Sequence, residues 1–433
     1  MKRTTFIKSL AFLSLFSCIT SCSNGKAALL FEASKNFNLS SGDLETENYQ
    51  KLIAGAKSFS AKLSEELLKD YQDGTNLAFS PISIYLDLGL GARASAGNTQ
   101  EQILNALNVD FETLNSSYKT LFCLLNDEYD EGKILTTNPV WLAQNQDLKF
   151  NEDTLKDLAN DYYCYSYSAD FANDNANANK AITNFIKEKT NGLLSPDLEL
   201  SSETFFVLLN TLYLKDVWNI LGRDLALYNG DIDFTNSDGS VASNKDFLLG
   251  NYETGLTYEN DDFESFYAET LNGYELIFIK PKGDKKVEDV FTQENIEYLM
   301  DHDFALGALD NENLLEHKTR VIFPEFEAEF FKEIKDTLIT DFGITDLFNY
   351  KCDLTPLVKS DVPHWCTDLI HATKLRVDKK GIEGAAISAL VDAGAAYDPY
   401  EKVFHDFVVD RSFGYLIRSG RDKILFSGVI ETL

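Results

Sequence analysis

The residue types that carry out catalysis are present in this chain, but they are not grouped into a catalytic motif. No GxSxG, HExxH or Walker pattern occurs in the 433 residues. Gly89-Leu90-Gly91 followed by Ala94 resembles a dinucleotide-binding loop, but it lies in a helical pattern and does not follow a strand. The five histidines lack metal-ligand spacing and stand at His302, His317, His364, His371 and His405. We therefore expect a protein that is not an enzyme and that binds no cofactor and no structural metal.

Composition excludes several other classes of protein. Apolar residues make up 44% and charged residues 25%, as in a soluble globular protein. Asp and Glu number 69 against 39 Lys and Arg, so the net charge of −30 disfavours nucleic acid as a partner. Six cysteines are too few for a disulfide scaffold. Cys352 and Cys366 are nevertheless close enough in sequence to form one disulfide in an exported chain.

The N-terminal 22 residues have the pattern of an export signal. Basic residues precede an apolar run at 10–16, which is too short to span a bilayer. Ile19-Thr20-Ser21-Cys22 resembles a bacterial lipobox, in which Cys22 becomes the lipidated first residue of the mature protein and anchors it to a membrane. The alternative is an ordinary cleaved signal in which Cys18 and Cys22 are incidental. Either interpretation places the protein outside the cytoplasm, anchored to the cell envelope or secreted.

The remaining chain is predicted to contain a tether and one folded domain. Residues 23–48 are polar and weakly patterned, and about 25 flexible residues have a reach of about 25–30 Å. Residues 49–433 contain no repeat or low-complexity block, so we expect one monomeric domain. It opens with a helix, because apolar residues recur at helical spacing from Leu52 to Leu67.

Helical patterns lie mostly in the N-terminal half, and strand patterns dominate the C-terminal half. Two further helices are predicted at 151–161 and 181–190. Apolar runs flanked by turn residues predict strands at Phe205–Leu214, Tyr274–Ile279, Arg320–Phe326, Leu369–Val377, Phe413–Ile417 and Ile424–Val429. This arrangement predicts an α+β domain.

The stretch GIEGAAISALVDAGAA, from Gly381 to Ala396, is unlike any of these elements. It contains no Lys, Arg or aromatic residue, and its many Ala and Gly residues make it a poor amphipathic helix and a poor core strand. In an extended conformation one uncharged face is formed by Ile382, Gly384, Ala386 and Ser388. The other face carries Glu383, Ala385 and Ile387. Such small side chains would allow the segment to enter between two existing strands.

This stretch resembles the reactive-centre hinge of the serpins, protease inhibitors whose exposed loop inserts into a sheet after cleavage. The resemblance covers the whole chain after the tether. Its other motifs are NLAFSPIS at 76–83, Gly91-Ala92 with Thr99 and Ile103, NTLYLK at 210–215 with Trp218, FPEF at 323–326, Leu338 with Gly343-Ile344 and Phe348, His371 before Gly381, Phe407 to Phe413, and ILFSG at 424–428. Their order and spacing are similar to those of the family.

The resemblance implies both a fold and a mechanism. The serpin fold has a large central, mostly antiparallel sheet with further sheets, about eight or nine helices and an exposed reactive-centre loop, here at about 379–403. A protease cuts the loop, and insertion of the cleaved loop into the central sheet traps the enzyme as a covalent acyl complex. The expected function is therefore that of an extracytoplasmic protease inhibitor acting as a suicide substrate.

Serpin loop geometry places the reactive bond between Ala395 and Ala396, with Tyr397 as the second choice. A small apolar residue before the bond would suit an elastase-like or subtilisin-like serine protease, and Tyr would suit a chymotrypsin-like one. Asp392 would suit a cysteine protease, but it lies too early in the loop.

Some hinge residues depart from the family pattern. Ile382 replaces the usual Thr or Ser at the first inserted position and Gly384 replaces Ala, and either change could slow insertion. Asp392 would point inward, where an unpaired carboxylate is costly. Ala385, Ala386 and Ser388 keep the hinge small. The alternative function is that of a non-inhibitory surface binding protein with the same fold.

Two further groups of residues follow from the resemblance. Ser80, Ser83, Asn210 and His371 match a polar cluster beneath the sheet opening, which we call the shutter and expect to gate insertion. Trp218, Lys379 and Glu325 match the upper end of the opening, the breach. Serpins carry Glu and Lys where this chain has Lys379 and Glu325, so we predict an ion pair of reversed polarity, worth about 0–1 kcal/mol if it is partly exposed.

Overall fold

The computed structural model describes the chain at residues 27–70, 74–145, 148–219, 224–243, 245–331, 333–382 and 400–433. Several predicted features lie outside these residues: the export signal with Cys22, the hinge residues Glu383, Gly384, Ala385, Ala386 and Ser388, then Asp392, and the reactive-bond residues Ala395, Ala396 and Tyr397.

The helices gather in the N-terminal half, as the sequence predicts. The described residues form nine α-helices and two short 3₁₀ helices: η1 (Ser41–Glu45), α1 (Glu47–Asp70), α2 (Pro81–Ala94), α3 (Gly97–Leu107), α4 (Phe111–Leu124), α5 (Glu152–Asp161), α6 (Asn175–Lys189), α7 (Val287–Val290), α8 (Gln293–Asp301), α9 (Lys335–Thr340) and η2 (Asp346–Phe348). The predicted helices correspond to α1, α5 and α6, although α6 begins earlier than expected. Gly89 and Gly91 lie within α2, which has Pro81 in its first turn.

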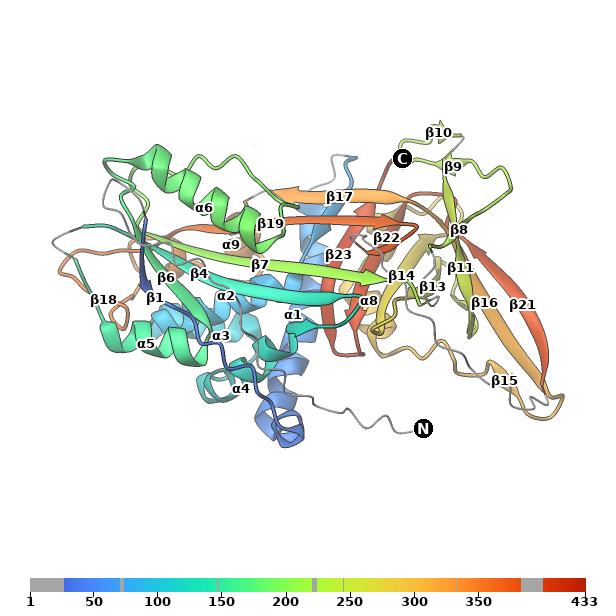
Figure 1. The fold of residues 1–433 in the computed structure, drawn as a ribbon, viewed down its shortest axis with the longest axis horizontal. Coiled ribbons are helices and arrows are strands. Elements are labelled where there is room, and N and C mark those ends of the chain that lie inside the picture. The colour runs from blue at the N-terminus through green and yellow to red at the C-terminus, as the bar shows by residue number, and fades with distance from the viewer. Residues whose placement is uncertain are drawn as a thin grey trace.

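The largest sheet crosses one half of the molecule (Figure 1). Its strands follow the order β1 (Ala28–Phe31), β6 (Cys164–Ala169), β4 (Lys133–Ala143), β7 (Phe206–Val217), β20 (Gly381–Ile382), β19 (Cys366–Asp378) and β17 (Phe326–Phe331), with β3 (Asn126–Glu128) paired to β4. Most neighbours are antiparallel, but β4 with β6 and part of β7 with β19 are parallel. The sheet is therefore mixed.

Two further sheets form the other half of the molecule. One contains β12 (Tyr258–Glu259), β13 (Phe263–Glu269), β14 (Tyr274–Pro281), β22 (Phe413–Ser419), β23 (Lys423–Ile430) and β2 (Leu77–Phe79). The other contains β15 (Leu309–Asp310), β16 (Leu315–Pro324), β11 (Phe247–Thr254) and β8 (Ala226–Leu227), with β21 (Glu401–Val408) paired to β16. Two small pairs complete the fold: β9 (Phe234–Thr235) with β10 (Val241–Ala242), and β5 (Lys149–Phe150) with β18 (Val358–Lys359).

Two sequence expectations about element boundaries need correction. The strand predicted over Arg320–Phe326 is two strands, because the chain leaves β16 after Pro324 and enters β17 of a different sheet at Phe326. The polar tether predicted over 23–48 is not a tether from residue 27 onward. Residues 28–31 form the edge strand β1 against β6, because this short apolar run gains backbone pairing there.

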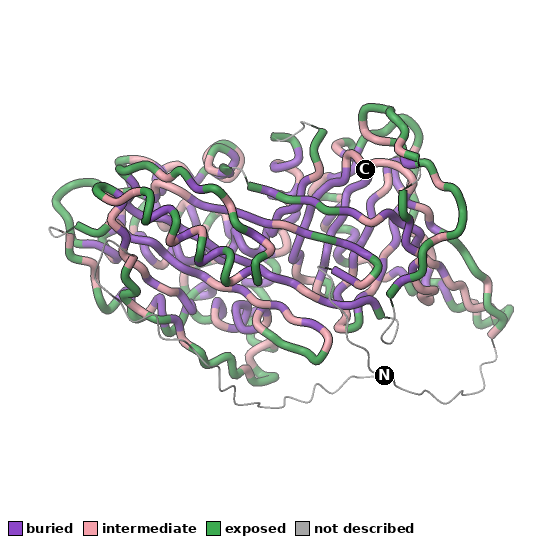
Figure 2. Tube along the Cα trace, turned by 45° about the horizontal axis from the view of Figure 1, so that its top comes forward, coloured by how far each residue is buried: buried purple, intermediate pink, exposed green. Residues whose placement is uncertain are grey.

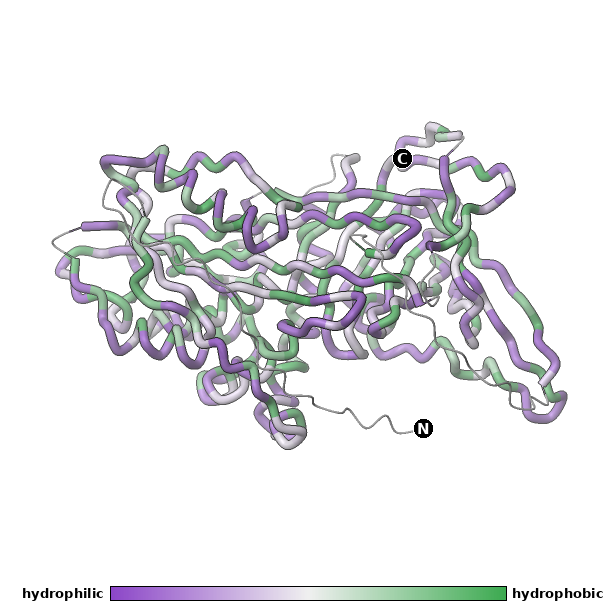
Figure 3. Tube along the Cα trace, viewed as in Figure 1, coloured by the Kyte–Doolittle hydropathy of each residue, from purple (hydrophilic) through white to green (hydrophobic). Residues whose placement is uncertain are grey.

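Buried residues run along the strands of the largest sheet (Figure 2), and their side chains belong to two cores. Along β7, Leu208 and Leu212 belong to the main core with α2, whereas Val207 and Leu209 belong to a second core with α6. Apolar segments accordingly recur along the strands and within the helices (Figure 3). This burial on both faces explains why the strand patterns are nearly continuous and not alternating.

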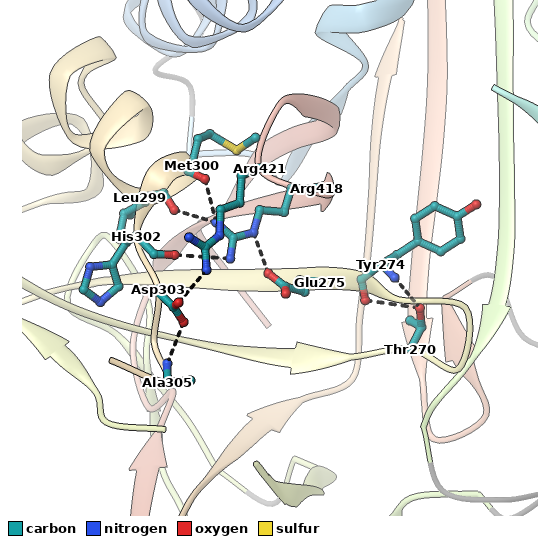
Figure 4. A network of polar contacts seen from close by, with 10 residues as sticks. All are labelled: Thr270, Tyr274, Glu275, Leu299, Met300, His302, Asp303, Ala305, Arg418 and Arg421. Atoms are coloured by element: carbon teal, nitrogen blue, oxygen red, sulfur yellow. Dashed lines mark hydrogen bonds and ion pairs between the residues drawn. The ribbon is translucent and has the colours of Figure 1, made fainter. Parts of the chain in front are cut away.

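A buried cation ties the second sheet to the end of a helix. The guanidinium of Arg418 on β22 lies 2.5 Å from the Glu275 carboxylate and donates to the carbonyl oxygens of Leu299 and Met300 at 2.8 and 2.9 Å (Figure 4). These carbonyls belong to the last turn of α8, whose acceptors lack partners within the helix. We assign this network to stability of the fold. No helix in the described part of the chain is long and apolar enough to cross a membrane.

Candidate functional site

The strands β7 and β19 pair directly over only part of their length. They run parallel from Phe206 opposite Cys366 to Asn210 opposite His371, a region that we call the closed seam. At the other end, β20 lies between them and is antiparallel to both. Between these places no ladder joins 211–215 to 372–376 within the described residues, and we call this stretch the open interval. The sheet is thus one strand short over part of its length.

Gly381 and Ile382 are the two predicted hinge residues that the structure describes, and both lie inside the sheet. Gly381 has a φ of +155°, and a Cβ atom there would lie 2.0 Å from the carbonyl oxygen of Asp216, so glycine is required. Ile382 is fully buried in the main core, opposite Asp216 and Val377. The expected exposed loop therefore does not begin at residue 379, because its first residues are already paired. The bulk of Ile382 is accommodated without cleavage.

Trp218 holds the turn that leads into the hinge. Its indole N–H donates to the carbonyl oxygen of Asp378 at 2.8 Å, and its backbone N–H donates to the carbonyl oxygen of Lys380 at 3.4 Å. The ring packs edge-on against Phe323, with centroids 5.5 Å apart. The contacts of Trp218 are therefore packing contacts plus two bonds that fix the direction from which Gly381 enters the sheet.

The predicted ion pair between Lys379 and Glu325 is wrong. The Glu325 carboxylate accepts a hydrogen bond from the backbone N–H of Lys379 at 2.9 Å, and the Lys379 ammonium lies 3.8 Å from Asp224. No ion pair joins the two predicted partners, although both belong to the described residues. The two residues are neighbours, as the resemblance implies, but the carboxylate binds the backbone because the lysine side chain points to a different acid.

Three of the four shutter residues form one hydrogen-bonded chain. The backbone N–H of Ser80 donates to Nε2 of His371 at 3.0 Å, and the Ser80 and Ser83 hydroxyls are 2.8 Å apart. Thr373 donates its hydroxyl to the carbonyl oxygen of Ala78. These bonds connect the start of α2 to β19.

The imidazole of His371 is neutral in this environment. Because Nε2 accepts a hydrogen bond, the ring proton resides on Nδ1, which has no hydrogen-bond partner in the described part of the chain. Complete burial lowers the pKa of His371 to about 3. The end of the closed seam therefore contains an unsatisfied donor, which disfavours the closed arrangement.

Asn210, the fourth shutter residue, belongs to a separate chain of hydrogen bonds. It lies opposite His371, and its amide donates to the hydroxyl of Thr136 at 3.1 Å and to the side-chain oxygen of Asn138. The Asn138 amide donates to the Tyr118 hydroxyl at 2.6 Å. This chain joins β7 through β4 to α4. The two chains face each other where His371 pairs with Asn210, and the second also reaches α2, because the Tyr118 hydroxyl donates to the carbonyl oxygen of Leu86 at 3.1 Å.

Several residues at this site were not predicted. Thr136 and Asn138 alternate in β4 and share a face with Asn210, a polar spacing in an apolar strand that could have identified them. No spacing rule connects Asp216 with Asn272, which binds both carboxylate oxygens of Asp216, through its side chain at 2.7 Å and its backbone N–H at 3.0 Å. Burial raises the pKa of Asp216 despite these bonds.

Cys352 and Cys366 are free thiols in the structure, so the suggested disulfide is absent. Burial raises the pKa of Cys352 to about 12 and raises that of Cys366 well above the usual range. Such thiols remain protonated and react slowly.

The fold and the site define a class of protein whose large sheet lacks one strand over part of its length, with the first residues of that strand in place. A family model described as "Serpin (serine protease inhibitor)" matches residues 54–432. The chain therefore belongs to the serpin family, whose members are in general inhibitors of serine proteases and not enzymes.

Individual comparisons agree with this assignment. The alpha-1-antiproteinase of Rattus norvegicus is 25% identical over 406 residues, which cover 89% of this chain and 90% of that protein. The crystal structure of the thermophilic serpin tengpin in its native state has a TM-score of 0.74 at 24% identity, covering 94% and 100% of the two chains. Human thyroxine-binding globulin has a TM-score of 0.69 at 19% identity, covering 88% and 99%. At these identities the two structures support the fold alone.

Proposed function

We propose that this serpin is an extracytoplasmic, monomeric inhibitor that traps a serine protease as a covalent acyl complex by inserting its cleaved loop between β7 and β19. The position of β20 carries the proposal. Gly381 and Ile382 already occupy the top of the open interval, in register with both flanking strands. Insertion therefore requires elongation of an existing strand and not the start of a new one.

The observed register identifies the neighbours of each inserted residue. If it continues, even-numbered loop residues follow Ile382 onto the core face. Ser388 would then lie between Asn210 and His371, and Leu390 between Leu208 and Leu369. The Ser388 hydroxyl would thus lie beside the polar side chains of Asn210 and His371. The Leu390 side chain would lie beside two leucines, so the loop matches the interior that it would enter.

Asp392 is the exception in this register. It would arrive beside Phe206, at the lower end of the closed seam, where it must protonate or find a partner. The last step of insertion is therefore expected to be the least favourable one.

The chemical step belongs to the protease. Its serine oxygen attacks the carbonyl carbon of Ala395, the peptide bond to Ala396 breaks, and the new N-terminus at Ala396 leaves with the released proton. The ester that remains links the protease to the loop. Insertion then carries the enzyme along the sheet and distorts its active site before water can hydrolyse the ester. Cleavage after Tyr397 is the second choice, and an elastase-like, subtilisin-like or chymotrypsin-like enzyme is the expected target.

The shutter would act as the gate for this movement. An entering strand must separate His371 from Asn210, while each residue keeps the hydrogen-bond chain on its own side of the seam. The interior donor Nδ1 of His371 would then come within reach of the Ser388 hydroxyl. The open state would thus satisfy a polar atom that the closed state leaves unpaired.

A lipid on Cys22 would hold the protein at the cell envelope. The lipobox-like pattern supports this part of the proposal. Because the described fold begins at residue 27, only a few residues separate it from Cys22, a span of about 18 Å at most. The anchor would therefore keep the domain near the membrane, and not about 25–30 Å away from it. Mass spectrometry of the mature N-terminus in the wild type and in Cys22→Ser tests this point.

The central experiment is incubation of residues 27–433 with elastase, subtilisin and chymotrypsin, followed by denaturing electrophoresis and mass spectrometry. We expect a complex that survives denaturation and a released peptide that begins at Ala396 or, for the second choice, at Asp398. A complex with a cysteine protease alone would correct the target class. Clean cleavage by every enzyme would favour a binding protein instead, a role that the name of the similar human thyroxine-binding globulin describes.

A matched pair of hinge variants separates cleavage from insertion. Ala386→Glu places a charge on the core face between Leu212 and Thr373, whereas Ala385→Glu places the same charge on the opposite face beside Lys374. Ala386→Glu should be cleaved at the normal rate without forming a complex, because a buried charge blocks insertion. Ala385→Glu should retain the complex. Equal behaviour of the two variants would contradict insertion in this register.

A further inference from the structure

An ionisable side chain lies beneath the closed seam without any partner. Ser83, Asp87 and Gly91 are spaced four residues apart on α2 and therefore lie on one face of the helix. Ser83 belongs to the shutter, and a Cβ on Gly91 would contact Leu208 of β7 at 3.4 Å. Asp87 lies between them and thus faces β7. It is 0% exposed, and neither carboxylate oxygen has a hydrogen-bond partner among the described residues.

Nothing charged compensates this carboxyl. Three titratable groups interact with it: Tyr118 from α4, Cys164 from β6 and Cys366 from β19. All three are neutral groups that are themselves buried, and burial raises the pKa of each. Burial alone raises the pKa of Asp87 well above its ordinary value near 3.8. The other elements that pack on α2, including α1, α3, β7 and β23, contribute no cation to it.

The neighbours of Asp87 place it under the part of the sheet that must open. Cys366 is the first residue of β19 in the closed seam, where it pairs with Phe206. The seam lies over α2, so separation of β7 and β19 would uncover the helix face that carries Asp87. Separation of the strands would admit water to a carboxyl that has no hydrogen-bond partner in the closed state. The closed sheet therefore bears a desolvation cost that the opened sheet relieves.

We propose that Asp87 is a built-in destabiliser of the closed seam, which promotes insertion of the reactive loop and does so more strongly as the pH rises. The inference rests on the proposed inhibitory function, since it assigns a residue that sets the rate of the same strand insertion. It requires no contact between Asp87 and the protease.

The direction of the pH effect follows from proton linkage. A raised pKa means that the closed state binds the Asp87 proton more tightly than an opened or unfolded state does. Protonated Asp87 therefore stabilises the closed state relative to the opened state by the full amount below about pH 3.8. This stabilisation is lost as the pH rises. Insertion should therefore accelerate as the pH rises above about 3.8.

The test compares the wild type with Asp87→Asn, which keeps the shape but cannot ionise, and with Asp87→Leu, which removes the polar group. At pH 8 both variants should raise the unfolding temperature of the intact protein by about 2–4 °C and slow complex formation several-fold. For Asp87→Asn the difference from the wild type should shrink toward pH 5. Asp153→Asn, whose carboxylate is 91% exposed in the first turn of α5, is the control and should reproduce wild-type behaviour at each pH.

Two readouts distinguish failure of this inference from failure of the proposed function. The first is the unfolding temperature of the intact protein, which needs no protease. A pH-independent change, or a fall in both variants, would overturn the assignment of Asp87. The second is the unfolding temperature after loop cleavage. If cleavage does not raise it even in the wild type, the loop does not insert and the proposed inhibitory function fails, whatever the Asp87 variants show.

Discussion

The carboxylate of Glu325 receives the backbone N–H of Lys379 at 2.9 Å, so the turn before the hinge is held by a side chain and a peptide group. A backbone donor does not depend on the identity of its residue. The lysine charge is therefore not needed for this contact.

Glu325→Ala should loosen this turn, whereas Lys379→Ala should not. Loss of the carboxylate leaves the Lys379 N–H unpaired and should cost about 1 kcal/mol of unfolding free energy. The Lys379 side chain is half exposed, and its ammonium forms a long ion pair with Asp224 at 3.8 Å. Because such surface pairs contribute little, removal of the side chain should change the unfolding free energy by less than about 0.5 kcal/mol. Hydrogen exchange of the Lys379 amide measures the effect directly. Equal destabilisation by both variants would restore the charge-pair interpretation.

Gly381→Ala should expel the hinge from the sheet. The new methyl group would lie 2.0 Å from the carbonyl oxygen of Asp216, and the φ of +155° disfavours any residue with a Cβ, so the paired conformation should lose about 1–3 kcal/mol. Complex formation with a target protease should fall while cleavage continues. Emission from Trp218 should shift, because its indole binds the turn at Asp378.

The matched control for this substitution is Lys380→Ala, one residue earlier in the turn. Only the carbonyl of Lys380 binds Trp218, so removal of its side chain should preserve both the emission and the complex. Wild-type behaviour of Gly381→Ala would mean that the hinge need not be paired before cleavage.

The sequence predicts the features of this site that depend on local patterns. The helical pattern that contains Gly89 and Gly91 corresponds to α2, and the apolar strands β7, β19, β22 and β23 follow from spacing and composition. The break at Glu325 is not visible, because the apolar pattern continues across it while the chain changes sheets.

Other features depend on contacts between distant segments and cannot be read from spacing. The isolation of Asp87 arises because elements distant in sequence surround it, among them α4, β6 and β19, and its neighbours in sequence give no indication of that. The pairing of β1 with β6 similarly depends on an edge that another part of the chain leaves free. The apolar run at 28–31 does not by itself reveal that a partner strand is available to it.

Phe37→Ala should weaken the attachment of the N-terminal segment. Its ring stacks on Tyr163 with centroids 5.3 Å apart, and the Tyr163 hydroxyl donates to the neighbouring carbonyl of Asn36. Loss of the ring should cost about 1 kcal/mol and should increase hydrogen exchange in β6, whose edge β1 covers. Leu30→Ala, in β1 itself and partly exposed, is a useful comparison. Unchanged exchange in β6 would show that β1 holds without the aromatic stack.

His371 should make the protein less stable as the pH falls. Its pKa is about 3 in the folded protein and about 6.5 in the unfolded chain, so the unfolded chain binds more protons below pH 6.5. The contribution of neutral His371 to the unfolding free energy is fully present above about pH 6.5. It decreases toward pH 3 by up to about 1.4 kcal/mol per pH unit. Asp87 has the opposite effect. Because its pKa is raised in the folded protein, its contribution to the unfolding free energy falls as the pH rises above about 3.8.

The two groups therefore offset each other between about pH 4 and pH 6, and single substitutions should reveal opposite slopes. His371→Gln, which retains an acceptor for the Ser80 N–H, should make the unfolding free energy fall with rising pH. Asp87→Asn should make it rise over the same range. Ser83→Ala removes a shutter hydrogen bond without removing a titration and should lower stability equally at each pH. Urea unfolding at pH 4, 5 and 6 measures these slopes, and parallel curves for His371→Gln and the wild type would show that His371 is not neutral in the folded state.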